Sequence, residues 1–116
     1  MLLRASGRTH DKTYELATVT GAVAGDGGVP HGRLLMAFAE AALGEDNGAL
    51  TRARDALAAA LGPPGLVDAA GVVGLFNAID RVADATGIPL EPEKAAASAD
   101  FRAALDLDRF ALADRI

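Results

Sequence analysis

Apolar residues recur every three or four positions along most of this chain, and no segment alternates apolar and polar residues as a half-buried strand does. A first helix is predicted over residues 12–24, with Asp11 as its N-cap and apolar side chains on one face. The glycine-rich residues 25–28 end it, because glycine readily adopts the positive φ angles found at helix termini. The pattern therefore predicts an all-α fold.

Two further helices are separated by a strong break. One helix is predicted over residues 32–43, and the next has Asp46 or Asn47 as its N-cap and ends near Leu61. The sequence Gly-Pro-Pro-Gly at residues 62–65 is the clearest break in the chain, because neither proline can lie in a helix interior. We expect a tight helix–helix connection there.

The fourth predicted helix, residues 66–86, is apolar on nearly all sides in its first half. A helix without a polar face is expected to be surrounded by other helices. Gly71 and Gly74 each cost about 1 kcal/mol relative to alanine in a helix interior, and we expect close approach of a neighbouring helix to compensate. Gly87 ends the helix and Pro89 prevents its continuation.

The last two predicted helices are shorter. A fifth helix begins at Pro92 or Glu93 and ends near Leu105. A short sixth helix follows, with Asp106 or Asp108 as its cap. The apolar residues of this sixth helix are Phe110 and Leu112.

Composition indicates how these helices are organised. The chain has 116 residues, of which 51% are hydrophobic and 23% charged. This length is typical of one domain, so residues 1–116 are predicted to form a single compact bundle of about four main helices and two short ones. Residues 1–10 become polar from Arg4 onward and are predicted to be a disordered N-terminal segment.

Several classes of function are disfavoured by composition. The sequence has no cysteine, which removes disulfides, iron–sulfur ligation and thiol nucleophiles. A net charge of −5 without a basic cluster argues against nucleic acid and anionic membrane as partners. The longest apolar run, residues 69–76, is far shorter than the about 20 residues of a membrane span, and no signal-peptide core follows the N-terminus. We expect a cytoplasmic protein with no membrane or nucleic-acid partner.

One polar constellation is a candidate ligand site. Asn77, Asp80, Arg81 and Asp84 are spaced so that they form one stripe on the fourth helix. In a structural interpretation, Arg81 bonds to Asn77 and Asp84 and fixes how this helix meets its neighbours. In a functional interpretation, the planar guanidinium of Arg81 holds an anion or a small carboxylate.

His31 and Asp68 are the candidates for acid–base chemistry. His31 lies at the predicted start of a helix, and Asp68 can act as an acid or base only if burial favours its neutral form. His10 and His31 lack the spacing of a metal-binding pair, so no metal site is predicted. No cofactor is predicted, because residues 25–28 lack the spacing of phosphate-binding loops.

A family resemblance covers roughly residues 33–90. It is carried by Phe-Ala-Glu-Ala (38–41), Leu-Val-Asp-Ala-Ala (66–70), Phe-Asn-Ala-Ile-Asp-Arg-Val-Ala-Asp (76–84) and Gly-Ile-Pro-Leu (87–90). These segments resemble the C-terminal half of the carboxymuconolactone decarboxylase and alkylhydroperoxidase D-like families. The resemblance implies an alkylhydroperoxidase D-like all-α fold that assembles into symmetric homo-oligomers.

The redox motif of the peroxidase branch, E-x-x-C-x-x-C-x-x-x-H, has no counterpart in this cysteine-less chain. Only Asn77, Arg81 and Asp84 match the family pattern, and they match a structural signature. We therefore expect a non-redox domain that acts through self-association or through binding a protein partner or ligand. The alternative is a thiol-independent decarboxylase or lactone-processing enzyme, in which Arg81 holds a small carboxylate and His31 or Asp68 moves protons. An accessory role toward another protein's cysteines is a third hypothesis.

Overall fold

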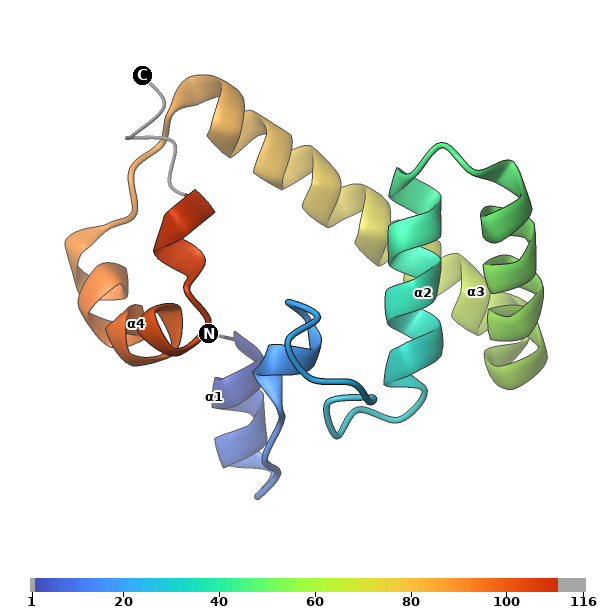
Figure 1. Cartoon of the computed structure of the whole chain (residues 1–116), viewed down its shortest axis with the longest axis horizontal. Coiled ribbons are helices and arrows are strands. Elements are labelled where there is room, and N and C mark those ends of the chain that lie inside the picture. The colour runs from blue at the N-terminus through green and yellow to red at the C-terminus, as the bar shows by residue number, and fades with distance from the viewer. Residues whose placement is uncertain (1, 111–116) are drawn as a thin grey trace.

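The computed structural model describes residues 2–110, which are helical and contain no strand. Figure 1 shows α2 beside the first part of α3, while the rest of α3 runs away from this pair toward α4. The elements in chain order are α1 (Leu2–Thr9), η1 (Leu16–Thr18), α2 (Gly32–Leu43), α3 (Asn47–Thr86), α4 (Pro92–Ala104) and η2 (Leu107–Phe110), where η denotes a 3-10 helix. The predicted all-α class is confirmed.

The predicted limits of α2 and the predicted start of α3 are confirmed. His31 precedes α2 in the left-handed region, with φ of 58°. Gly32 begins the helix against the carbonyl oxygen of Asp26, with which a Cβ at this position would collide. Asp46 caps α3, because its Oδ1 accepts a hydrogen bond of 3.0 Å from the backbone N–H of Ala49.

The predicted break within α3 is also confirmed. Gly62 has φ of 73° and ψ of 172°, which are not helical values, and Pro63 and Pro64 follow it directly. We call residues 47–61 the proximal half of α3 and residues 66–86 its distal half. The distal half ends at Gly87, whose φ of 64° is left-handed and whose N–H donates to Ala83, as the sequence predicts.

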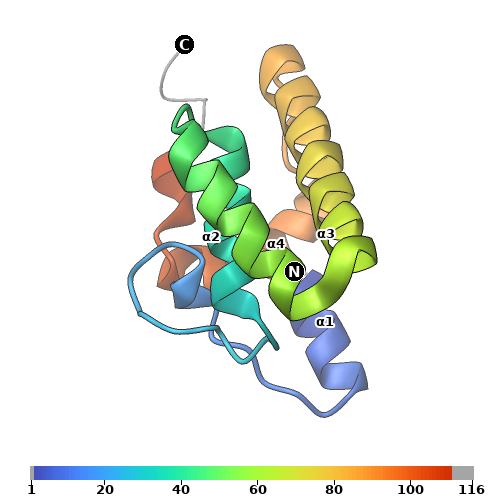
Figure 2. The ribbon, with the colours of Figure 1, turned by 90° about the vertical axis from the view of Figure 1, so that its right-hand side faces the viewer.

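The compact bundle is not observed. Phe38 and Leu57 are the buried large hydrophobic side chains among the described residues, and no residue of the distal half is buried. The Cα radius of gyration is 15.7 Å, against about 13 Å for a compact domain of this length. Figure 2 shows the distal half standing apart from the α2 pair along much of its length. The prediction was wrong because no segment within residues 2–110 encloses this apolar helix.

The surroundings of Gly71 and Gly74 also differ from the prediction that a neighbouring helix approaches them closely. No neighbouring atom of the described residues lies within 4 Å of a Cβ built at either position. The close approach of a second helix, expected as compensation for these glycines, is therefore not seen in the part of the chain that the structure describes.

The N-terminal region also differs from prediction. The structure places α1 within the segment predicted to be disordered, and only η1 lies in the predicted helix 12–24. The hydroxyl of Thr18 donates to the carbonyl oxygen of Glu15 at 2.8 Å, and such bonds compete with helical backbone pairing. The backbone N–H of Glu15 also donates to Gly27 at 2.9 Å, which turns the chain back toward α2.

At the C-terminal end, α4 forms where predicted and η2 replaces the sixth α-helix. Asp106 has φ of 52°, and this left-handed residue separates the two elements. Arg102 on α4 donates to Asp108 on η2 at 2.6 Å, and its Nε donates to Ser98 at 3.1 Å. The predicted helix position of Leu112 lies outside the described residues.

Candidate functional site

The polar stripe predicted from the sequence lies on the distal half of α3. Asn77 is half-buried, whereas Asp80, Arg81 and Asp84 are exposed. Within residues 2–110, Arg81 makes no hydrogen bond or ion pair with Asn77 or Asp84. The internal pairing expected in the structural interpretation is therefore absent. An exposed ion pair gains little free energy from holding two side chains in one geometry, so its absence here costs little. The Arg81 guanidinium can therefore contact solvent or a ligand.

The two acid–base candidates are both exposed. His31 precedes α2, and its ring makes no hydrogen bond that caps the helix. Asp68 lies near the start of the distal half, without the burial that an acid–base role would require. No group of three potential metal ligands occurs in the described part of the chain.

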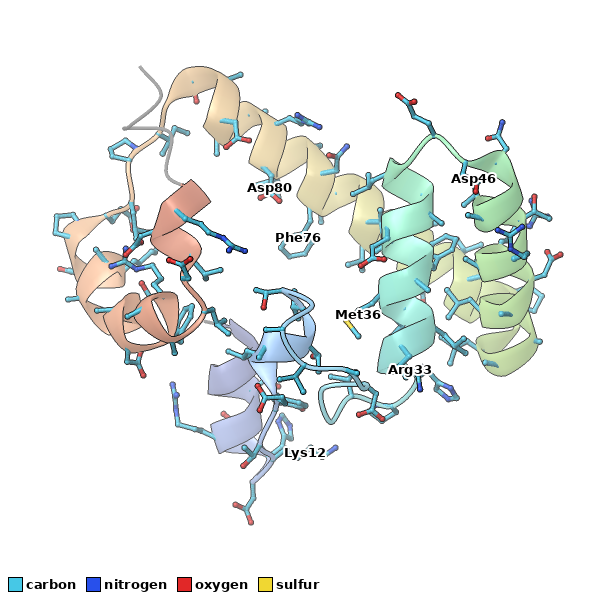
Figure 3. All side chains as sticks on the ribbon, in the orientation of Figure 1. Lys12, Arg33, Met36, Asp46, Phe76 and Asp80 are labelled. Atoms are coloured by element: carbon cyan, nitrogen blue, oxygen red, sulfur yellow. The ribbon has the colours of Figure 1, made fainter. Side chains whose placement is uncertain are left out.

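An apolar cavity of about 390 Å³ lies between α2 and the distal half of α3. In Figure 3, Met36 points from α2 toward the open centre of the molecule, and Phe76 points toward the same space from α3. Such a lining offers no convergent polar groups to orient a reacting substrate. The lining residues are Leu35, Met36, Phe38, Ala39, Ala69, Val72 and Val73.

A second cavity, of about 530 Å³, lies between α2 and the proximal half of α3. Its polar residues include Glu40, Glu45, Asp46 and Arg52, and alanines form much of the remaining wall. Backbone N–H groups of Ala49 and Gly48 lower the pKa of Asp46, because they donate hydrogen bonds to its carboxylate. Asp46 is thus engaged as a helix cap. Arg81, His31 and Asp68 lie outside the linings of both cavities.

An apolar face of the distal half, which the sequence predicts to be covered, is exposed among the described residues. We call four residues of the distal half, spaced three, four and three positions apart, the apolar seam. Phe76 lies beside them and is 52% exposed. The seam residues and their exposed fractions are Val72 (56%), Leu75 (58%), Ile79 (53%) and Val82 (59%). This spacing follows the a and d positions of two successive seven-residue repeats, the positions that face a partner helix in coiled coils.

The seam points largely away from α2 and from the polar stripe, although Val72 at its N-terminal end also lines the cavity with α2. At 100° per residue, its centre lies roughly 120° around the helix from Ala69 and Val73, which line the cavity with α2. Asn77, Arg81 and Asp84 lie roughly 140–180° from that centre. The distal half therefore carries separate polar and apolar surfaces, and both the four seam residues and Arg81 are exposed.

By length and composition alone, α3 could cross a membrane. Its most apolar window of 18 residues has a mean hydropathy of 1.5 and is 6% buried. Residues 65–86 contain Asp68, Asp80, Arg81 and Asp84, and residues 47–61 are too few for such a window. Every window of 18 residues with at most two charges therefore includes part of the break at residues 62–64. A straight helical span is not available.

Comparison with known proteins adds no constraint on the site. No family model, curated protein or solved structure matches this chain. The resemblance of residues 33–90 to the carboxymuconolactone decarboxylase and alkylhydroperoxidase D-like families therefore stays a prediction from sequence motifs.

Proposed function

We propose that this chain is a non-redox helical domain that acts by self-association through the apolar seam. The observation that supports this function is the exposure of the four seam residues, each more than half accessible. The proposal agrees with the alkylhydroperoxidase D-like resemblance, which implies symmetric homo-oligomers. It also agrees with a chain that has no thiol for redox chemistry.

The exposed apolar area is large enough to form the centre of an interface. Together with Phe76, the seam exposes roughly 400–500 Å² of apolar surface, the size of patch that marks interaction sites. A standard interface buries about 800 Å² per partner, so the seam could form its apolar centre. Fully burying a Val, Leu or Ile side chain gains about 1.5–3 kcal/mol. Covering the exposed half of eight such side chains gains roughly 8 kcal/mol, comparable to the about 4–15 kcal/mol that association costs.

A protein partner fits this face better than a lipid bilayer does. A bilayer requires every backbone polar group to be satisfied within the spanning segment. Non-helical Gly62 and the two prolines after it interrupt that pairing within every sufficiently apolar window. The charges of Asp68, Asp80 and Asp84 on the distal half add a further cost in hydrocarbon.

Sedimentation velocity of the purified chain over a wide concentration range tests this function. We expect the wild type to form a dimer or a larger symmetric oligomer. Ile79→Lys should shift the equilibrium to monomer, because it places a charge in the seam. Val67→Lys is the matched control, since Val67 is 69% exposed on the same helix but lies off the seam.

Circular dichroism must show that both lysine variants keep the helical content of the wild type. A wild-type chain that stays monomeric at all concentrations would contradict the proposal. So would equal loss of association in the two variants. Flotation with zwitterionic vesicles tests whether the seam binds a membrane. A monomeric chain that binds these vesicles through the seam would show that the face serves membrane binding and not self-association.

A second candidate function is a thiol-independent enzyme on a small carboxylate. It is favoured by one observation, the exposed guanidinium of Arg81 with no partner among residues 2–110. Thermal shift and turnover with a panel of small carboxylates would test it, with Arg81→Ala as the variant and Arg54→Ala as the control. If Arg81→Ala leaves both readouts unchanged, this function is rejected.

A further inference from the structure

We infer that two copies of this chain pair through antiparallel distal halves of α3, with Val72 of each copy against Val82 of the other and Leu75 against Ile79. This inference rests on the proposed self-association, and it specifies the partner, its direction and its register. Such an arrangement is isologous, because each copy contributes the same surface.

The sequence of the seam is symmetric about one position. Val72 and Val82 lie five residues on either side of Asn77, and Leu75 and Ile79 lie two residues on either side. In a seven-residue repeat, Val72 and Ile79 occupy a positions, whereas Leu75 and Val82 occupy d positions. An antiparallel pair centred at residue 77 therefore places each a residue opposite a d residue. All four seam side chains of both copies are then covered at once.

Asp68 gives the pair its direction. It lies one heptad before Leu75, so it continues the line of the seam at its N-terminal end, and its side chain is exposed. In a parallel pair, the two Asp68 carboxylates would face each other beside apolar side chains, which costs both repulsion and desolvation. In the antiparallel pair centred at residue 77, Asp68 faces Thr86 instead.

Thr86 is compatible with that position. It is exposed and uncharged, and its hydroxyl donates to the carbonyl oxygen of Val82 at 2.6 Å within its own helix. The hydroxyl therefore needs no partner across the pair, while the carboxylate opposite it remains at the open end of the seam. The antiparallel direction thus avoids a like-charge contact without burying an unpaired group.

The flank of the seam leaves room for a second helix. A Cβ built at Gly71 has no neighbouring atom of the described residues within 4 Å, and Ala78, one heptad later, is also small and exposed. Interaxial distances between helices depend on the side chains at the contact. Small residues on this flank therefore allow the two helices to approach closely.

Single cysteines test this arrangement on a chain that has none of its own. Val72→Cys and Val82→Cys chains, carrying tags of different size, are mixed under reducing conditions, allowed to exchange and then oxidised. In the antiparallel pair, Cα atoms of the two positions come within disulfide range, whereas two copies of residue 72 lie roughly 15 Å apart along the axis. We expect the mixed disulfide dimer to exceed either homodimer by about tenfold.

Asn77→Cys is the matched control, because residue 77 lies on the side opposite the seam and should give no disulfide dimer. Sedimentation under reducing conditions must first show that each variant associates as the wild type does. Homodimers of Val72→Cys and of Val82→Cys would reveal a parallel pair and overturn the inference. An associating chain that yields neither mixed nor homodimeric disulfides would overturn it too, while leaving self-association intact. A monomeric wild type would instead reject the proposed function.

Discussion

The Oδ1 atom of Asp46 accepts a hydrogen bond of 3.0 Å from the backbone N–H of Ala49 at the first turn of α3. The first N–H groups of a helix have no partner within it, so this carboxylate satisfies one of them. Hydrogen bonds from Ala49 and Gly48 hold the pKa of Asp46 below its usual value. Because α3 begins here and packs its proximal half on α2, the cap helps to stabilise the best-packed part of the molecule.

We expect the contribution of this cap to be lost in acid. A folded-state pKa below the unfolded-state value means that ionised Asp46 stabilises the fold above its ordinary pKa of about 3.9. That stability is lost as the pH falls through the lower folded-state pKa. Urea unfolding should therefore show wild type to be more stable than Asp46→Ala at pH near 7, with the difference shrinking below pH about 4.

Asp46→Asn distinguishes the effect of the capping hydrogen bond from the effect of the carboxylate charge. An asparagine side chain also accepts a hydrogen bond at this position but does not titrate. This variant should resemble wild type at neutral pH more closely than Asp46→Ala does. A difference between wild type and Asp46→Ala that stays constant from pH near 7 into acid would show that the carboxylate makes no such contribution.

Leu57 is the best-buried large side chain of the described residues and has no exposed surface. Truncation of its side chain should therefore lower the free energy of unfolding far more than truncation of an exposed apolar side chain on the same helix. We expect Leu57→Ala to lower the free energy of unfolding by about 3 kcal/mol, through lost transfer energy and the cavity left behind. Chemical unfolding at fixed protein concentration measures this change.

Val67→Ala is the control for Leu57→Ala, because Val67 is 69% exposed and lies off the apolar seam. Its effect should stay within about 0.5 kcal/mol. Equal costs for the two substitutions would mean that α2 and the proximal half of α3 do not form the principal core.

The sequence predicts the local limits of helices well where one residue type determines them. The limits of α2, the Asp46 cap, the break at Gly62 and the left-handed Gly87 all follow from local backbone chemistry. Such features depend on only a few neighbouring residues, so they can be inferred without knowledge of the tertiary fold.

The arrangement of the helices is less predictable. The apolar distal half of α3 was expected to be enclosed, but helical periodicity does not distinguish burial within one chain from burial between two chains. The absent helix at residues 12–24 has a local cause instead, since Thr18 bonds to Glu15 and the Glu15 backbone bonds to Gly27. For the candidate site, sequence spacing places Arg81 on a polar stripe but could not show that Arg81 forms no hydrogen bond or ion pair with Asn77 or Asp84 within residues 2–110.

Alanine substitutions at Gly62 and Gly74 should change the free energy of unfolding in opposite directions. Gly62 has φ of 73° and ψ of 172°, a region that is essentially restricted to glycine. We expect Gly62→Ala to destabilise the fold by about 1–3 kcal/mol and to change the angle between the two halves of α3. Gly74 is helical with open space around it, so Gly74→Ala should stabilise by about 0.5–1 kcal/mol.

Thermal unfolding and small-angle scattering of both variants measure these effects. Scattering should report a changed radius of gyration for Gly62→Ala alone. Destabilisation by Gly74→Ala would indicate that a backbone from a second copy approaches that glycine, in conflict with pairing through the apolar seam.

Asp68 should determine the direction of pairing, whereas Asp84 on the opposite side of the helix should not. Asp68→Asn removes the like-charge cost of a parallel pair, so parallel and antiparallel dimers should become closer in free energy. In the background of Leu75→Cys, disulfide homodimers should then increase several-fold, because only a parallel pair places the two copies of residue 75 directly opposite each other. Asp84→Asn in the same background changes the net charge equally and should leave the yield unchanged. Equal increases in both double variants would indicate a general effect of net charge, and Asp68 would then have no role in selecting the antiparallel arrangement.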